Sequence, residues 1–367
     1  MAIKVAHLTT CHPRDEVRIF QKECQSLVAM GYEVHLVVAD GKGEALVRGV
    51  HIHDAGKTHG RLARMVLLPW RIWRVARKIK ARIYQMHEPE LLLIALLLKW
   101  AGARVIYDSH EDVPRAVLSR DWISARYRKL VSAAYERFED FISSHIAAVV
   151  GATPHITKRF SRVNFRTVTL NNFPLASEVH AVALKSGLGR NVCYIGAISA
   201  VRGIMEMIDS LEGADARLIL AGAFESAALE KAARALPGWS RVDYRGSVSR
   251  KDVLEIMTQS RAGLLLYHPE PNHVDAQPNK MFEYMSAGLP LVASNFPLWV
   301  EGLTEVGAGV CVDPLDVKAI SQALKKILDD EAGMIEMSRR GREAVLTKYQ
   351  WIFEEPKLAA LYEDLLS

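Results

Sequence analysis

The sequence has few cysteines and no long hydrophobic run. It has four cysteines in 367 residues, and no two of them form a CxxC pair. This spacing argues against a disulfide framework or a zinc site and suits a reducing cytosol. The longest apolar run, Leu91–Leu98, is too short to span a bilayer and predicts a buried helix. No signal-peptide pattern precedes the first apolar segment, so we expect a cytoplasmic chain.

Motifs for several common chemistries are also missing. The chain contains no GxGxxG dinucleotide fingerprint, no GxxxxGK[ST] phosphate loop and no GxSxG nucleophile elbow. Their absence disfavours dehydrogenases, nucleoside triphosphatases and serine hydrolases, although other loops can still bind nucleotides. A DxD motif in a strand-end loop and a spacing typical of metal ligands are absent as well. We therefore expect neither a metal site nor a cofactor.

Short apolar, β-branched segments alternate with helical patterns along the chain, which is typical of βαβ units in a parallel sheet. In the first half the expected strands are Ile3–Leu8, Val34–Val38, Arg82–Met86, Arg104–Tyr107 and His145–Val150. In the second half they are Val192–Ile195, Arg217–Leu220, Val242–Tyr244, Gly263–Leu266, Leu291–Ala293 and Gly309–Val312. The pattern predicts an α/β protein with two doubly wound parallel sheets. Ligands are expected in a cleft between them, outside the carboxyl ends of the strands.

Length and charge also divide the chain in two. A chain of 367 residues exceeds the size of one hydrophobic core. The segment Leu170–Ala176, with a proline and two asparagines, is a plausible linker. Residues 1–175 carry 27 Lys and Arg against 16 Asp and Glu, a net charge of +11, whereas the remainder carries −6. The basic half is expected to meet something anionic.

The most informative segment is Tyr267–Pro290, which follows an apolar strand. Its prolines mark a loop, and a helix is predicted to begin near Asn279 and to end at Gly288. The unpaired N–H groups and the positive dipole at that helix start can bind a pyrophosphate, and Lys280 adds a cation. Glu283 shares a helix face with Asn279, where a carboxylate can accept hydrogen bonds from ribose hydroxyls. A capped surface helix is the alternative.

The string PNKMFEYMSAGLPLVAS resembles the signature of family 4 of the retaining glycosyltransferases (glycosyltransferase group 1), which have the GT-B fold of two Rossmann-like domains. The signature contains two acidic residues eight positions apart, here Asp275 and Glu283, and the family usually has Glu at the first. The shorter Asp275 carboxylate changes the reach to the donor sugar's hydroxyls. The resemblance implies that Glu283 binds the donor ribose. It also implies that backbone N–H groups around Lys280, Met281 and Phe282 hold the pyrophosphate.

Two further segments match the family. Residues 194–203, YIGAISAVRG, resemble an element that contacts the donor phosphates. Gly196 is followed by Ala197 where relatives have an arginine, and Arg202 stands where they have a lysine. The resemblance implies that Arg202 and Lys280 neutralise the phosphates, since either residue type suits that contact. The segment Tyr244–Gly246 (Tyr244, Arg245 and Gly246) resembles the turn whose backbone contacts the nucleobase in the family.

Charged residues follow the first expected strand, where many relatives have a Gly-Gly loop. The segment HPRDEVRIF offers His12, Arg14, Asp15 and Arg18 and resembles a branch of the family with an HPRDxxRIF pattern. In the implied fold this turn faces the donor phosphates. Arg14 and Arg18 are four residues apart and can present a like-charged face to an anion. Pairing between arginine and aspartate within the loop is the alternative.

Two later strands of the first half are each followed by a histidine and an acid. These pairs are His87–Glu88 and His110–Glu111. Residues just past the carboxyl ends of strands are expected to face the cleft. By resemblance, the segment DSHED holds the active-site histidine, His110, beside the reacting sugar. Glu88, Glu111 and Asp112 remain equal candidates for a base.

A basic stretch without acids lies between Asp54 and Glu88. Residues 57–82 contain nine Lys and Arg, interleaved with Trp70 and Trp73 at helical spacing. Pro69 predicts two shorter helices instead of one. An amphipathic basic helix with tryptophan is typical of an element that lies on an anionic membrane surface. A nucleic-acid surface would need a recognition motif, which is missing, and a solvated helix face is the remaining alternative.

These patterns together predict a retaining, metal-independent glycosyltransferase. It would move a sugar from a nucleotide-diphosphate donor to a saccharide acceptor, which we expect to be lipid-linked, at the inner face of a membrane in bacterial-type polysaccharide or glycolipid synthesis. Fixed cations and helix-end amides can stabilise the leaving diphosphate, and a histidine or carboxylate can activate the acceptor hydroxyl. In the implied fold the terminal helix, residues 350–367, crosses back to the acceptor domain of residues 1–172, and residues 173–349 bind the donor. The alternatives are a nucleotide-sugar epimerase and a non-catalytic partner subunit.

Overall fold

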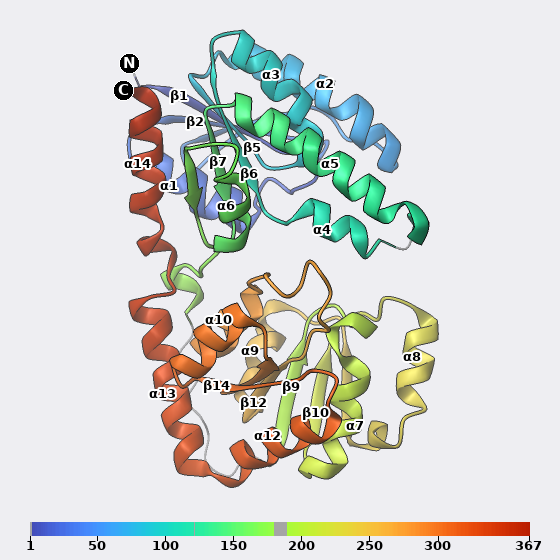
Figure 1. The fold of residues 1–367 in the computed structure, drawn as a ribbon. Helices are drawn as coiled ribbons and strands as arrows, with labels where there is room; N and C mark the ends of the chain where they lie inside the picture. Colours follow the sequence, from blue (N-terminus) through green and yellow to red (C-terminus); the bar gives the residue numbers. More distant parts are fainter. Residues whose placement is uncertain (1, 121, 180–188) are drawn as a thin grey trace. The chain divides into compact units, whose positions relative to one another are not determined.

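The computed structural model describes residues 2–120, 122–179 and 189–367. These form two compact units, Met1–Asn172 with Trp351–Ser367 and Phe173–Gln350. Each unit has a mainly parallel sheet with helices packed against it (Figure 1). The fold class is therefore α/β with two Rossmann-like units, as the alternation of strand and helix patterns predicts.

The first unit contains eight strands among the described residues. Their order in the sheet is β3-β4-β2-β1-β5-β6-β7-β8, and β3 alone of these pairs antiparallel, with β4. The buried, β-branched strands β1, β2, β5 and β6 occupy its centre, as in parallel sheets covered on both faces. The strands are β1 Lys4–Leu8, β2 Glu33–Val38, β3 Ala45–Val47, β4 Val50–Asp54, β5 Ile83–Met86, β6 Arg104–Ser109, β7 Ala148–Gly151 and β8 Thr167–Thr169.

Two groups of helices cover this sheet. One face packs in a single apolar cluster with α2 (Arg61–Ile79), α3 (Leu92–Trp100), α5 (Ala125–His145) and α6 (Pro154–Phe160). Alternate strand residues turn to the other face, which meets the π-helix η1 (Val17–Cys24) and the terminal helix α14 (Glu355–Leu366). There Tyr362 donates a hydrogen bond of 2.8 Å to Gln85 Oε1. The remaining helical segments are α1 Gln25–Ala29, η2 Pro89–Leu91, α4 Val113–Leu118 and η7 Trp351–Phe353.

The second unit has a six-stranded sheet among the described residues, in the order β11-β10-β9-β12-β13-β14, with every pairing parallel. One apolar cluster joins it to α7 and α12, and another joins its other face to α9, α10 and α13. The strands are β9 Asn191–Ile195, β10 Arg217–Ala221, β11 Val242–Gly246, β12 Ala262–Leu265, β13 Leu291–Ser294 and β14 Gly309–Val312. The helices are η3 Ala176–Glu178, η4 Ala200–Arg202, α7 Ile204–Ala214, α8 Ala227–Arg234, η5 Pro237–Arg241, α9 Arg250–Thr258, α10 Asn279–Ala287, α11 Pro297–Trp299, η6 Val300–Glu305, α12 Val317–Asp329 and α13 Glu331–Thr347.

Three expectations about local structure are wrong. Pro69 lies inside α2 without ending it, because the buried stripe of Leu68, Ile72 and Ala76 continues past it and outweighs the roughly 3 kcal/mol cost of an internal proline. His145 ends α5 and does not begin a strand. The terminal segment is not one helix: a short 3-10 turn precedes α14, which begins next to Pro356.

Candidate active site

Helix α10 begins after the loop that follows β12. Pro278 is its N-cap and Asn279 its first residue, so the N–H groups of Asn279 and Lys280 lie where a helix offers no backbone partner. Gly288 ends the helix with φ 75°, and a Cβ atom there would lie 2.4 Å from Arg342 Nε. Helix α10 therefore begins and ends where the sequence predicts. It turns the positive end of its dipole toward the loop.

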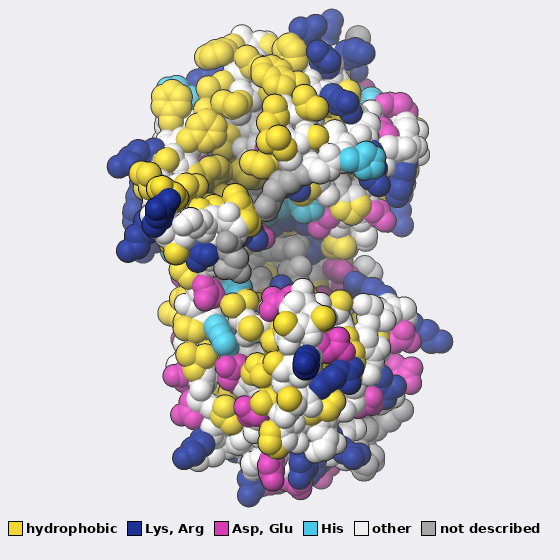
Figure 2. All heavy atoms as spheres, turned by 90° about the vertical axis from the view of Figure 1, so that its right-hand side faces the viewer, with side chains coloured by type: hydrophobic (Ala, Val, Ile, Leu, Met, Phe, Trp, Pro, Cys, Tyr) yellow, Lys and Arg dark blue, Asp and Glu magenta, His cyan; other side chains and the backbone are white. Residues whose placement is uncertain are grey.

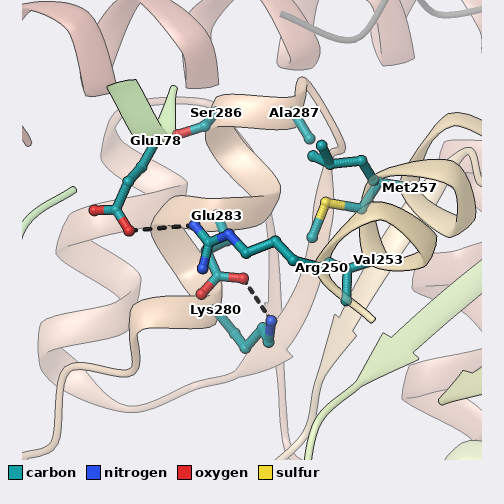
Figure 3. Close-up of a pocket in the computed structure, with 9 residues that line it drawn as sticks. Glu178, Arg250, Val253, Met257, Lys280, Glu283, Ser286 and Ala287 are labelled. Carbon is teal, nitrogen blue, oxygen red and sulfur yellow. Dashed lines mark hydrogen bonds and ion pairs between the residues drawn. The ribbon is translucent and has the colours of Figure 1, made fainter. Parts of the chain in front are cut away.

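Lys280 and Glu283 line a small pocket between α10 and α9 (Figure 3). Their side chains form an ion pair with 2.5 Å between Nζ and Oε2. Arg250, at the start of α9, pairs with Glu178 at 3.2 Å in the same pocket. The pocket volume is about 100 Å³, which suits one group such as a ribose, since whole-ligand pockets measure roughly 300–1,000 Å³. The other lining residues are Val253, Leu254, Met257, Ser286 and Ala287.

The side chains of Met281 and Phe282 point into the core. Both are almost fully buried, and the Phe282 ring lies 5.0 Å from that of Phe173. These two residues therefore offer a ligand only their backbone. The Met281 N–H already donates to Pro278 O at 3.0 Å, so this amide is engaged within the turn.

Arg202 lies at the end of the turn η4, beyond β9. Its guanidinium is 5.3 Å from the Tyr267 ring, at the start of the loop that leads to α10. It also donates to Ala197 O at 3.3 Å, within the segment that begins at Gly196. Gly203, which follows, has φ 73°, and a Cβ atom there would lie 2.0 Å from Leu266 O. The Arg-Gly pair thus packs directly against the strand that precedes the α10 loop.

The loop between β12 and α10 is anchored at both ends. The His268 N–H donates to Val201 O at 2.8 Å, and Trp299 Nε1 donates to Ala276 O at 2.7 Å. Asp275 lies half-buried within the turn that these bonds hold. The fold thus places Asp275 on an anchored loop four residues before α10.

The turn at the end of β11 is tied to its own unit. The Tyr244 hydroxyl donates to Gly222 O at 3.1 Å. Arg245 is exposed and pairs with Asp243 at 2.5 Å. Neither side chain lines the pocket beside α10, so the backbone of this turn is the part that a nucleobase would contact.

In the first unit, three histidines form a chain from the core to the carboxyl edge of the sheet. His7 Nδ1 lies 2.9 Å from His87 Nε2, and His87 Nδ1 lies 3.2 Å from His110 Nε2. Asp108 Oδ2 is 3.2 Å from both His87 Nδ1 and His110 Nε2. The side chains of His7, His87 and Asp108 are fully buried, whereas that of His110 is 19% exposed. His110 is thus the end of the chain that a substrate can reach.

A buried ion-pair network supports these histidines. Arg18 lies 2.9 Å from Asp108 Oδ1 and 3.1 Å from Glu23 Oε1. Burial alone would raise the pKa of Asp108, but Arg18 and the histidines hold it well below its usual range. Burial and the Asp108 charge raise the pKa of Glu23, and burial lowers those of His7 and His87. Asp108 is thus the carboxylate whose charged form Arg18 and the histidines favour.

Comparison with known proteins decides the family. A model described as "Glycosyl transferase 4-like domain" matches residues 17–175, and one described as "Glycosyl transferases group 1" matches residues 178–344. The chain belongs to the group 1 glycosyltransferases.

Relatives of known structure have the same GT-B fold. Sucrose-phosphate synthase from Thermosynechococcus elongatus has a TM-score of 0.80 at 15% identity, over 99% of both chains. The Anabaena protein Alr3699/HepE, in complex with UDP-glucose, has a TM-score of 0.72 at 14% identity, over 99% of this chain and 100% of that chain.

One curated relative is the GDP-mannose:cellobiosyl-diphosphopolyprenol alpha-mannosyltransferase of Xanthomonas campestris. It is 27% identical over 171 residues, which cover 44% of this chain and 44% of the relative. The chain thus aligns with less than half of that protein's length.

In this group 1 glycosyltransferase, Arg14 and Arg18 do not form the like-charged face expected from their spacing. Arg14 bonds to Asp40 through Nε and Nη2, at 2.6 and 2.7 Å. Arg18 is buried against Asp108 and Glu23 and donates to Leu170 O at 2.8 Å. Both arginines pair with acids, although not with Asp15 within the loop as the alternative has it. Asp40 and Asp108 are distant in the sequence, which is why local spacing did not reveal these pairs.

The three candidate bases differ in their surroundings. Glu111 is exposed. Asp112 is buried, with His155 Nε2 3.4 Å away and Arg159 Nε 3.9 Å away. Glu88 is also buried, and it accepts hydrogen bonds from Thr9 and Thr10.

The fold also assembles residues that sequence reasoning missed. The fold brings Cys11, His12 and Glu88 together at the edge of the first sheet, a cluster of potential metal ligands that no local spacing in the sequence predicts. Asp108 lies within the DSHED segment, but nothing local marks it as the partner of His87. Glu178 and Arg250 belong to none of the sequence motifs identified above. Cys11 and Glu88 are 77 positions apart, Asp108 and its partner Arg18 are 90 apart, and Glu178 and Arg250 are 72 apart, so no local pattern could have found these contacts.

Proposed function

We propose that the chain transfers a sugar, with retention of anomeric configuration, from a nucleotide-diphosphate sugar to a saccharide acceptor. The observation that carries this proposal is the pocket along α10 that Lys280, in the first turn, and Glu283, in the second, line together. The two side chains form an ion pair with each other. A diphosphate attracts Lys280 and frees Glu283 to accept hydrogen bonds from the ribose hydroxyls. Asp275 is assigned to the hydroxyls of the donor sugar.

Two protein cations and backbone dipoles support a mechanism without a metal ion. Lys280 and Arg202 each offer a charge to the phosphates, and the amides at the start of α10 add partial positive charge. As the sugar leaves, negative charge develops on the diphosphate, and these groups are already in place to stabilise it. Either cation type can bind phosphate, so arginine in place of the family's usual lysine preserves the contact.

His110 is assigned to the acceptor. Asp108 is ionised, so it accepts hydrogen bonds from His87 Nδ1 and His110 Nε2, which lie at equal distances from the same oxygen. This arrangement fixes the proton on His110 Nε2 and leaves Nδ1 as a hydrogen-bond acceptor. Such a nitrogen can orient or deprotonate the acceptor hydroxyl. Asp108 therefore acts as a positioning residue for His110.

The acceptor is proposed to be lipid-linked, because the first unit carries a surface suited to an anionic membrane. Figure 2 shows hydrophobic side chains gathered over this unit. Five exposed apolar side chains lie on the first half of α2, and basic side chains follow on its second half. Within the described residues, no helix has the length and hydropathy to cross a bilayer. The pattern favours a helix lying in the interface. The α2 residues are Leu62, Met65, Val66, Leu67 and Trp70, then Arg71, Arg74, Arg77 and Lys78.

The choice of donor is best tested by ligand-induced stabilisation. The names of the similar proteins mention two donors, GDP-mannose and UDP-glucose. We expect one nucleotide sugar in a panel that includes both to raise the melting temperature. A ligand at 100 times its Kd adds about 2.7 kcal/mol to the free energy of unfolding. Stabilisation by none of the panel would refute donor binding, whereas binding without turnover on any acceptor would favour a non-catalytic subunit.

A further inference from the structure

Three potential metal ligands lie together beside the histidine chain. Cys11 and His12 follow β1, and Glu88 follows β5. Their ligand atoms all lie within 4.8 Å of one another. Glu88 Oε1 is 3.4 Å from Cys11 Sγ and 3.6 Å from His12 Nε2. A thiol, an imidazole and a carboxylate thus lie within reach of one another.

These separations fit a tetrahedral ion. Zinc binds sulfur at about 2.3 Å, and imidazole nitrogen or carboxylate oxygen at about 2.0–2.2 Å. Two ligands of a tetrahedral zinc ion therefore lie roughly 3.3–3.6 Å apart. The measured distances from Glu88 Oε1 to the sulfur and to the nitrogen are of this size.

Neighbouring groups hold the Glu88 carboxylate in place. Glu88 accepts hydrogen bonds from the Thr9 hydroxyl and, at 2.8 Å, from the Thr10 N–H. Such outer contacts orient ligands in metal sites. Cys11 is exposed and the His12 side chain is 30% exposed, so a hydrated ion can reach both.

The two neighbouring clusters of potential ligands are already neutralised. One contains His7, Glu23 and His87, and the other contains His87, Asp108 and His110. Arg18 lies between Glu23 and Asp108 at ion-pair distance from both, in the core. A divalent ion would have to displace that arginine. At Glu88, by contrast, the nearby Arg64 pairs with Glu90 at 3.3 Å.

We propose that Cys11, His12 and Glu88 bind Zn²⁺, with a fourth position left to water. Thiolate and imidazole ligands select zinc over magnesium or calcium. The ion would sit beside His110, whose ring centroid is 5.5 Å from that of His12. Bound zinc therefore blocks the approach of an acceptor and inhibits transfer, a consequence that rests on the role proposed for His110.

Cobalt provides a spectroscopic test on the full chain. Titration with Co²⁺ should produce a thiolate-to-cobalt charge-transfer band in the near ultraviolet, which Zn²⁺ then removes by displacement. Cys11→Ser should abolish the band, while Cys311→Ser, at a half-buried cysteine of the second unit, should keep it. Thr9→Val should weaken cobalt binding at least about tenfold through loss of the outer contact. No band in the wild type, or a band that persists in Cys11→Ser, overturns the proposal.

Activity gives a second, separate readout. Zn²⁺ should inhibit transfer by the wild type and leave Cys11→Ser unaffected, because Cys11 has no part in the proposed transfer. Full wild-type activity with the cobalt site saturated by Zn²⁺ would contradict the inhibitory role. If no nucleotide sugar supports transfer, the proposed function fails, and the cobalt spectra still decide whether the metal site exists.

Discussion

At the scale of single residues, the account depends most on Glu283. Glu283→Ala should weaken binding of the nucleotide sugar by about 1.5–3 kcal/mol, or roughly 10- to 150-fold, because it removes a charge-assisted hydrogen bond to the ribose. Isothermal titration calorimetry measures this directly. Glu230→Ala is the matched control, since Glu230 also pairs with a cation one helical turn away but lies on α8, outside the pocket. Wild-type affinity in Glu283→Ala would remove the ribose assignment.

Asp108 is predicted to act through His110. Asp108→Asn should lower kcat by about 100-fold, the scale of a positioned acid–base group, with little change in donor Kd. It should also alter the populations of the His110 tautomers, measured by nitrogen-15 NMR. Glu139→Gln is the control, because Glu139 is equally buried and paired with Arg159 at 2.5 Å. An unchanged His110 tautomer in Asp108→Asn would refute positioning, even if both variants lose stability.

At this scale the sequence predicts exposed site residues better than buried ones. Lys280 and Glu283 form part of a continuous motif, so their common helix face follows from spacing alone. Asp108 carries no such signal, because its partner Arg18 is 90 positions away. The anion-binding role expected for Arg18 is wrong for the same reason. Sequence alone shows an arginine near a strand-end loop, and only the fold shows that it pairs with buried carboxylates.

At the scale of elements, helix α2 is predicted to dock on anionic membranes. Replacing Arg71, Arg74 and Lys78 by Gln should weaken binding to anionic vesicles by about 3 kcal/mol, roughly 100-fold, since each cation near such a surface contributes about 1 kcal/mol. Co-sedimentation measures it, at low and high salt. The control replaces three exposed lysines of α12, Lys318, Lys325 and Lys326. Equal binding by both triple variants would leave α2 as an ordinary solvated face.

Strands β2 and β4 are predicted to lose stability in acid. His35 on β2 lies 3.0 Å from His53 on β4, and burial, then His53 and His51, lower its pKa from 6.5 to about 4. Below pH 6.5 the His35 imidazole is protonated in the unfolded chain but stays neutral in the folded chain. The free energy of unfolding is therefore highest above pH 6.5 and decreases as the pH falls toward 4. The loss should be on the order of 1–3 kcal/mol. His35→Gln should flatten this dependence in thermal melts; an identical pH profile would refute it.

The elements found from sequence share one property. Central strands such as β1 and β12 are buried on both faces and read as apolar runs bounded by turns. The missed strands β3 and β8 lie at the two ends of the sheet, where short and partly polar segments suffice because one side has no partner. The missed strand β4 lies next to β3 and is also partly polar. Helix α2 shows that tertiary packing can outweigh local propensity, because the burial of its apolar stripe keeps the helix continuous past Pro69.

At the scale of the whole molecule, the two units are predicted to divide the labour. A nucleotide sugar should protect α9, α10 and η4 of the second unit from amide hydrogen exchange, because the proposed donor contacts lie there. Helices α2 and α3 of the first unit should exchange as before. Mass spectrometry of peptides from the two units makes the comparison within one sample. Protection confined to the first unit would reverse the assignment of the donor.

The decisive measurement is acceptor-dependent release of nucleoside diphosphate. The full chain is incubated with the nucleotide sugar that stabilises it and with a polyprenyl-diphosphate-linked saccharide, in chelator. Release should require the acceptor, persist without divalent ions, and fall to background in both Glu283→Ala and His110→Ala. If release instead stops in chelator and returns with magnesium, or continues unchanged in Glu283→Ala, the transfer mechanism proposed for this chain is wrong.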